Sequence, residues 1–253
     1  MKSYKIILLF CFVICCITAC KKQIDQSTGT QNGATVATSE SSSTEFSAAN
    51  FLFVNHINNP YLSFAPGTDF YYINTIKEDG DVSHEHIHVV VTNDIKRILG
   101  VNCTVIHDQV KEDGEITEDT YDWYAQDKFG NVWYFGEDTK ARTDTGWTTE
   151  GSWEAGKHNA LPGIVMFANP GNFLGFTYYE EFQRNVAEDQ AINLNVNSSV
   201  TVPYGSFTHC LETKEFTRLD PEDIEHKFYA KGVGQVLTTS ATEREKLISI
   251  THN

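Results

Sequence analysis

The chain has 253 residues, with 19 Lys and Arg against 34 Asp and Glu, and its formal net charge at neutral pH is −15. Such an acidic chain repels phosphate backbones and anionic membrane surfaces, which argues against nucleic-acid binding. The acids also have an ordinary explanation, solubility outside the cytoplasm, and we prefer it to a cation-binding role.

The first residues have the features of an export signal. Lys2 and Lys5 precede an apolar run, residues 6–17, that is too short to cross about 30 Å of hydrocarbon. Small residues then lead to Cys20. This pattern resembles the signal peptide of bacterial lipoproteins, which is cut before the cysteine. A plain secretory leader is the alternative.

The resemblance implies that residues 1–19 are removed and that the Cys20 thiol is lipidated, so that acyl chains such as palmitate hold the protein in a membrane. Two lysines and no acid would leave with the signal, so 17 basic residues and a net charge of −17 remain. Lys21, and not Asp, follows Cys20. By the sorting pattern of the lipoproteins that this signal resembles, the outer membrane is implied if the cell has two membranes.

Residues 20–50 predict a disordered tether that begins with the lipidated cysteine. They are rich in Ser, Thr, Gly and Gln, have Phe46 as their only aromatic residue, and lack strand or helix periodicity. Residues 51–253 then form one domain, and Glu45 to Asn55 could begin it with a short helix.

Turn signals predict that this domain is all-β. Asp79-Gly80 and Asp113-Gly114 mark hairpins, and Gly130 suits the left-handed position of a third turn. Strands are expected at 68–76, 83–92, 97–110, 116–126, 132–140, 146–154, 173–183, 189–196, 206–217, 224–230, 234–240 and 244–251. So many consecutive antiparallel strands would leave open edges in a flat sheet. We expect a single antiparallel meander curved into a half-barrel or a closed barrel.

Only two cysteines, Cys103 and Cys210, lie within the domain. A disulfide between them is one possibility in an oxidising compartment. Two free, buried thiols are the other, because Cys103 alternates with apolar residues on one strand face.

Several motifs resemble an uncharacterised group of bacterial secreted proteins and lipoproteins. The likeness covers nearly all of residues 60–240, and Lys231 stands where that group usually has Pro. The motifs are Pro66-Gly67, DWYAQD at 122–127, GNVWYFGE at 130–137, GSWEAG at 151–156, VPYGSF at 202–207 and YAKGVG at 229–234. The resemblance implies one domain and leaves its function open.

Two short segments, residues 205–211 and 229–236, are also similar to the envelope domains LolA and LolB. Those domains are half-barrels that hold lipid or acyl chains. They contain a helix that plugs the half-barrel, and we predict no helix of that length in this chain.

Aromatic residues alternate on several of the expected strands. Trp133, Phe135 and Glu137 share one strand face in this pattern, and Trp123 lies on the hairpin partner. A buried carboxylate is costly unless it is paired, so Glu137 favours a ligand cavity over a packed core, which is the alternative. The candidate ligand-binding residues are Trp123, Trp133, Phe135, Glu137, Trp153 and Tyr178.

His84, His86 and His88 alternate on one strand and are weak candidates for a metal site. Ile87, Val89 and Val91 occupy the opposite face, which is the expected core side. The histidines are therefore expected to face solvent as ordinary polar residues, and no metal or cofactor is predicted.

Familiar catalytic motifs for hydrolases, phosphate binding and dinucleotide binding do not occur in the sequence. Asp122, Glu137 and Glu154 could supply two carboxyls for glycoside cleavage, but acids are too common here to favour that role. No catalytic residue is predicted.

These observations predict a cell-envelope lipoprotein, without the marks of an enzyme, that binds a small apolar or amphipathic ligand such as a lipid in its β domain. One alternative is a surface module that binds carbohydrate or another partner through exposed tryptophans. A metal protein or hydrolase is the weaker alternative.

Overall fold

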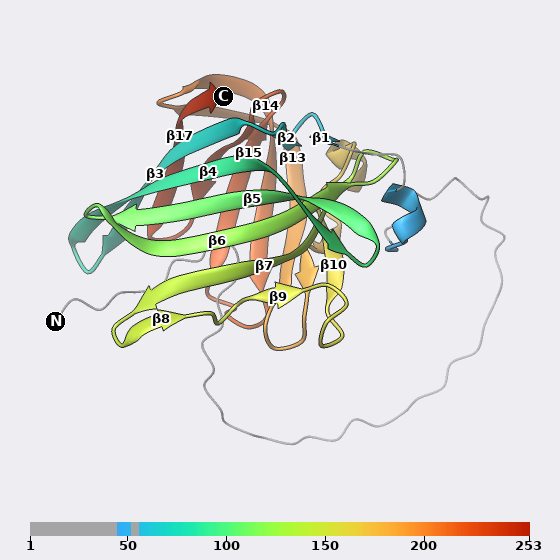
Figure 1. Cartoon of the computed structure of the whole chain (residues 1–253). Helices are drawn as coiled ribbons and strands as arrows, with labels where there is room; N and C mark the ends of the chain where they lie inside the picture. The colour runs from blue at the N-terminus through green and yellow to red at the C-terminus, as the bar shows by residue number, and fades with distance from the viewer. Residues whose placement is uncertain (1–44, 52–55) are drawn as a thin grey trace, which may run out of the picture.

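The computed structural model describes residues 45–51 and 56–253 (Figure 1). The predicted signal peptide, Cys20 and the tether as far as residue 44 lie outside the described residues. Within the described ranges, no helical segment combines the length and the apolar character needed to cross a bilayer.

The described chain is built from strands and two short 3-10 helices, η1 (Ala48–Phe51) and η2 (Pro170–Phe173). The strands are β1 (Ile57–Asn58), β2 (Ser63–Phe64), β3 (Thr68–Glu78), β4 (Asp81–Ile98), β5 (Val101–Glu112), β6 (Glu115–Gln126), β7 (Val132–Thr143), β8 (Gly146–Thr148), β9 (Trp153–Glu154), β10 (Leu161–Met166), β11 (Thr177–Tyr179), β12 (Glu181–Phe182), β13 (Asp189–Val202), β14 (Gly205–Thr217), β15 (Ile224–Ala230), β16 (Gly234–Thr239) and β17 (Glu243–His252).

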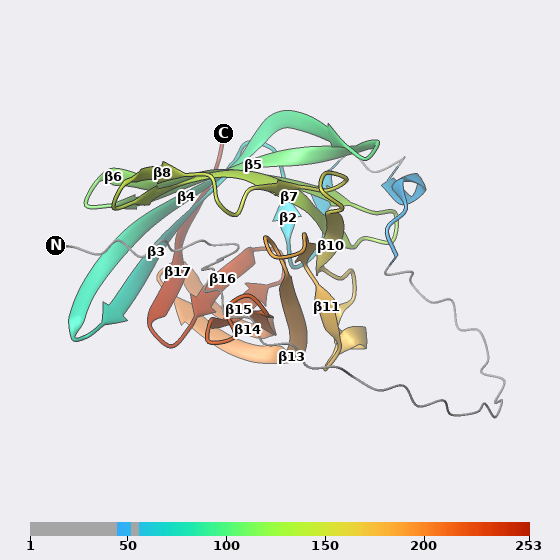
Figure 2. The ribbon, with the colours of Figure 1, turned by 90° about the horizontal axis from the view of Figure 1, so that it is seen from below.

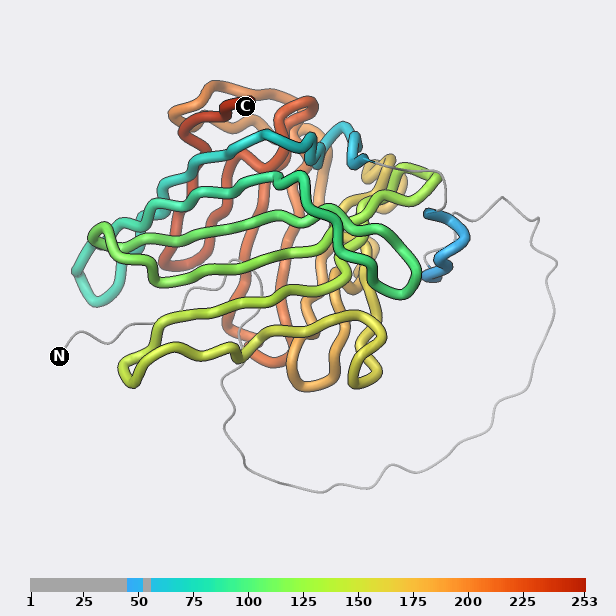
Figure 3. The backbone as a smooth tube through the Cα atoms, in the orientation of Figure 1, coloured from blue at the N-terminus to red at the C-terminus, as the bar shows by residue number. Residues whose placement is uncertain are grey.

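The predicted antiparallel meander is confirmed. A 15-stranded sheet runs in the order β11-β13-β14-β15-β16-β17-β3-β4-β5-β6-β7-β10-β12, with β8 and β9 attached to β7. The sheet curves into two facing walls, β3 to β8 on one side and β13 to β17 on the other, and nearly closes into a barrel (Figure 2). Pairing of β17 with β3 joins the two walls, so the end of the chain lies beside an early strand (Figure 3).

One extended segment closes the remaining gap. β11 bonds to β13, while β12 bonds to β10, and only Glu180 separates β11 from β12. The segment passes so close to β10 that a Cβ on Gly163 would lie 2.3 Å from the Glu180 carbonyl carbon. Closure at this point therefore requires a residue without a side chain.

The predicted hairpin turns are confirmed, since Asp79-Gly80 and Asp113-Gly114 have positive φ angles at both positions. The strand expected at 97–110 is wrong at its start, because the chain turns at Leu99-Gly100 with φ of 50° and 86°. Leucine at the first position of such a turn lacks the Asn or Asp that would signal it. β10 was also not predicted, since Pro162 and Gly163 interrupt its pattern.

The outer face of β7 is covered by the start of the described chain. The rings of Phe46 and Phe51 lie 5.8 and 5.6 Å from that of Phe135, and 6.1 and 6.0 Å from Trp133. The packed part of the chain thus includes Phe46 and η1, which lies within the segment where a short helix was expected.

Cys103 and Cys210 are both free and buried. Burial raises the pKa of the Cys103 thiol to about 12, so this thiol stays protonated and unreactive near neutral pH.

Closure at Gly163 can be tested by substitution. Gly163→Ala should lower the free energy of unfolding by about 2 kcal/mol or more, because the added methyl meets the backbone of residues 179–180. Gly171→Ala is the matched control, since its Cβ would meet only Val196 at 3.8 Å and should change stability by less than about 0.5 kcal/mol. Equal urea midpoints for the two variants would contradict the tight approach.

Candidate functional site

A bulge at Gly136 divides the predicted ligand-binding residues between two faces of the sheet. Tyr134 pairs with Tyr124 and Glu137 pairs with Asp122, so three residues of β7 span the same distance as two of β6. Gly136 takes up the extra residue with a φ of 128°. Glu137 therefore shares a face with Tyr134, and its expected place beside Trp133 and Phe135 is wrong.

Trp123, Trp133 and Phe135 lie on the outer face of the barrel but are covered. Their exposed fractions are 5%, 2% and 0%. Phe46 and Phe51 cover Trp133 and Phe135, and the Lys96 ammonium lies 3.0 Å from the centre of the Trp123 ring. Because Trp123 and Trp133 are buried, neither presents its ring to a carbohydrate.

Glu137 and Trp153 face the interior of the barrel. The Tyr134 hydroxyl donates a 2.6 Å hydrogen bond to Asp122 and also hydrogen-bonds to Glu137. Trp153 packs edge-on against Tyr134 at 5.4 Å, and its indole N–H has no acceptor among the described residues. The two carboxyls and the tyrosine thus form one buried polar group.

Tyr178 is half-buried at the closing segment. Its hydroxyl donates a 3.1 Å hydrogen bond to Asn193, and its ring packs edge-on against Phe167 at 4.8 Å. The next residue on the same side, Glu180, is buried. Tyr178 therefore borders the interior at the point of closure.

The interior contains many more acids than the aromatic pattern suggested. One row of residues paired across the strands illustrates this. Asn74 of β3 pairs with Glu85 of β4 on one side and with Glu245 of β17 on the other. The same row reaches Glu112 on one side and Lys227 on the other. The buried carboxyl residues of this interior are Glu85, Asp108, Glu118, Asp122, Glu137, Glu180, Glu181, Glu215 and Glu245.

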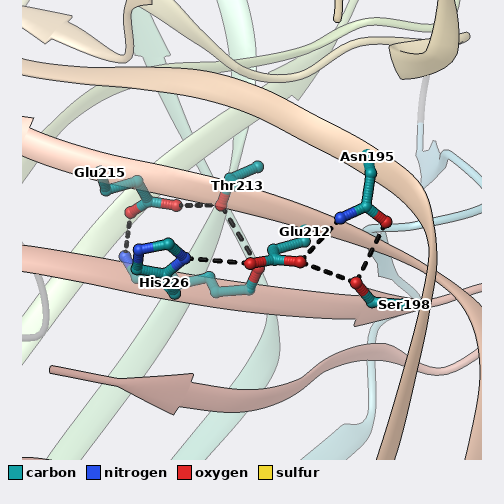
Figure 4. Close-up of polar contacts among 7 residues, drawn as sticks. Asn195, Ser198, Glu212, Thr213, Glu215 and His226 are labelled. Carbon is teal, nitrogen blue, oxygen red and sulfur yellow. Dashed lines mark hydrogen bonds and ion pairs between the residues drawn. The ribbon is translucent and has the colours of Figure 1, made fainter. Parts of the chain in front are cut away.

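Among the described residues, Lys227 is the only buried lysine or arginine. Its ammonium bonds to Glu215 and lies 3.7 Å from Glu225. Burial alone would lower the pKa of Lys227, but Glu215, Glu225 and Glu180 raise it above its ordinary value. Thr213 donates a 2.9 Å hydrogen bond to Glu215 and completes this group (Figure 4).

A second polar group lies on the outer face of the same strands. Glu212 accepts hydrogen bonds from Ser198 at 2.7 Å and Asn195 at 2.8 Å, and His226 Nδ1 lies 3.1 Å from its other oxygen (Figure 4). The carboxylate stands between the hydroxyl and the imidazole. A serine–histidine relay needs direct contact between those two groups, so this arrangement does not provide one.

Four interior acids on neighbouring strands form what we call the carboxyl cluster: Asp108 of β5, Glu118 and Asp122 of β6, and Glu137 of β7. Each is more than nine-tenths buried. Their strongest charged neighbours are one another, together with Glu245, Glu181 and Glu85. Burial raises the pKa of all four, and no described Lys or Arg forms an ion pair with any of them.

The histidines of β4 are on the solvent side of the sheet, opposite Ile87 and Val91. His88 bonds to Asp69 at 2.8 Å and stacks on Tyr71 at 4.4 Å, while His84 contacts Thr75. Over residues 45–51 and 56–253, no group of three or more His, Cys, Asp or Glu side chains is arranged to hold a metal ion.

Glu154 is separated from the cluster, because its carboxylate bonds to Lys96 at 2.8 Å and to Lys157 at 2.9 Å. Of the acids considered for glycoside cleavage, the structure brings together only Asp122 and Glu137.

Sequence reasoning did not identify Glu85, Asp108, Glu118 or Lys227 as interior residues. A signal existed on β6, where Glu118 and Asp122 alternate in phase with Tyr124. Solubility outside the cytoplasm explains exposed acids, but it does not explain acids that are buried inside the barrel.

No protein-family model and no curated protein matches the sequence. Two solved structures are similar. One, from Bacteroides fragilis NCTC 9343, is described as exported with a YmcC-like fold; it is 13% identical, with 77% of this chain and 100% of that chain covered and a TM-score of 0.41. The other, from Parabacteroides distasonis ATCC 8503, is described as a lipoprotein; it is 11% identical, with 76% and 99% covered and a TM-score of 0.45. Similarity this low carries no argument about activity, and the motif resemblances stay predictions.

The interior acids predict that stability falls as pH rises. Burial raises the pKa of Glu85 from 4.5 to about 7, of Glu245 to about 7 and of Glu118 to about 8. A carboxyl with a raised folded-state pKa stabilises the fold below its unfolded pKa, and this contribution is lost as pH rises through the folded value. One such group accounts for about 3 kcal/mol. Urea denaturation should therefore show at least this loss between about pH 5 and pH 8.5.

Glu118→Gln should reduce that loss. Asp119→Asn is the control on the outer face of the same strand, where hydrogen bonds from His107 and Gln109 lower the pKa of Asp119 in spite of partial burial. Asp119 is ionised across this pH range and its only imidazole partner is the partly exposed His107, so its substitution should change the loss by about 1 kcal/mol at most, less than Glu118→Gln does. Stability that rises with pH would contradict the raised pKa values.

Proposed function

We propose that this protein is a lipid-anchored cell-envelope protein, held in the outer membrane through Cys20, whose barrel interior binds a small amphipathic ligand. The observation that carries the proposal is the carboxyl cluster, which is buried without ion pairs beside Tyr124, Tyr134 and Trp153. Binding sites combine aromatic walls with a few polar groups in this manner. A wholly apolar ligand would leave these carboxyls unsatisfied, so an amphipathic one fits better.

The anchor is tested by labelling cells with a palmitate analogue. The wild-type protein should incorporate the label and fractionate with the outer membrane, whereas Cys20→Ala should lose both properties because the thiol is the acyl acceptor. Cys16→Ala, inside the predicted signal, is the matched control and should still be labelled. Labelling of Cys20→Ala, or none in the wild type, would contradict the anchor.

Ligand binding is tested by native mass spectrometry of the full-length protein, purified gently in mild detergent at neutral pH. We expect a reproducible bound mass that is reduced in Glu137→Gln, because this change alters an interior acid. Trp123→Phe, on the covered outer face, should retain it. Absence of any bound species, or its loss only in Trp123→Phe, would contradict binding in the interior.

A further inference from the structure

We propose that the carboxyl cluster receives the ammonium group of an organic amine, so that the ligand of the barrel interior is a cation on an aliphatic stem. This inference rests on the proposed function and names the chemical class of its ligand.

The first argument comes from acceptors that have no donor. Asp108 is 8% exposed and receives no hydrogen bond from the described residues. Glu118 accepts one hydrogen bond from Thr120, but its second oxygen has no donor. One oxygen of Glu137 also has no donor. Buried polar atoms are rarely left without partners, and each costs about 1–3 kcal/mol. All of these atoms are carboxyl oxygens, which in the ionised form only accept hydrogen bonds, so they favour a ligand that donates and carries positive charge.

The second argument is that one ammonium group of the chain itself, that of Lys227, is already bound by acids of this interior. On the facing wall, the Lys227 side chain places an ammonium between Glu215 and Glu225. A primary ammonium on a methylene stem is therefore compatible with this interior. The ion pairs of Lys227 described above are with Glu215 and Glu225. The four acids of the carboxyl cluster have no such ion pair with a described lysine or arginine.

The third argument is the distribution of acids toward one end of the barrel. Glu85, which is buried, pairs with Glu112, which is half-buried beside the Asp113-Gly114 turn. Glu118 lies further inside on the neighbouring strand, and Asp122 lies beyond it. This row of carboxyls leads from the hairpin end to the cluster, and each one that is ionised attracts a cation. At the inner side of the cluster, the stacked rings of Tyr124 and Tyr134, 4.7 Å apart, offer aromatic contact to a cation or its stem.

Binding should depend on pH because the receiving carboxyls hold their protons to higher pH than exposed carboxyls do. Asp108 faces Asp122 and Glu118 of β6, Glu245 of β17 and Tyr72 of β3, while Glu137 also faces Glu181 of β12. Burial and these acids raise the pKa values of the cluster. An arriving ammonium favours the ionised carboxyls, so protons leave the cluster for the buffer, and affinity rises as pH increases from 6 to 8.

The test is isothermal titration of the full-length protein in mild detergent with 1,5-diaminopentane. Measurements at about pH 6 and pH 8, in two buffers of different ionisation enthalpy, report proton release. We expect saturable binding that is at least about tenfold tighter at the higher pH. The neutral analogue 1,5-pentanediol and sodium chloride at equal ionic strength should not reproduce it.

Asp108→Asn and Asp122→Asn should each weaken diamine binding at least about tenfold, and circular dichroism will confirm that both variants fold. Asp119→Asn, on the outer face of β6, should bind as the wild type does. Diamine binding that is absent, matched by pentanediol, or unchanged in both interior variants would overturn the inference. If mass spectrometry then showed a neutral ligand lost in Glu137→Gln, the proposed function would stand alone; with no ligand at all, both would fail.

Discussion

Closure of the sheet by the extended segment 177–182 is the constraint on which the interior depends. The segment bonds to β13 through its first half and to β10 through its second half, and Gly163 allows the close passage. With the gap closed, the inner faces of the two walls are turned toward each other. Acids on those faces then have little access to water, and several of their oxygens have no hydrogen-bond donor among the described residues.

Much of the fold could be predicted from local sequence. Asp-Gly pairs have few structural roles other than tight turns, and the alternation of β6 and β14 identified both strands. Leu99-Gly100 is not an Asp-Gly pair, so the turn was not predicted there, and the predicted strand 83–92 is shorter than β4. The Gly136 bulge could not be foreseen, because register between strands depends on both partners, whereas alternation is a property of one strand. Glu137 was placed on the wrong face for this reason.

The site was less predictable than the fold because the first half of β7 is apolar on both faces, with Trp133 and Phe135 on one and Tyr134 on the other. Trp133 and Phe135 indicated an enclosed face, and both are buried. They are covered by Phe46, which lies in the predicted tether, and by Phe51, the first residue of the predicted domain. Sequence alone cannot say which of two apolar faces is covered by the opposite wall. The acids of β6 alternate in phase with Tyr124, yet the overall negative charge gave them a simpler explanation.

The pairing of β3 with β17 has a consequence for the order in which the protein can fold. Register partners such as Phe70 and Ile250 are separated by nearly the whole domain. A chain that is delivered from its N-terminus, whether by a ribosome or through a membrane, exposes the free edge of β3 until residues 243–252 arrive. Non-local contacts of this kind slow folding and leave strand edges open to aggregation. The edge of β3 is therefore protected only after β17 has emerged and paired with it.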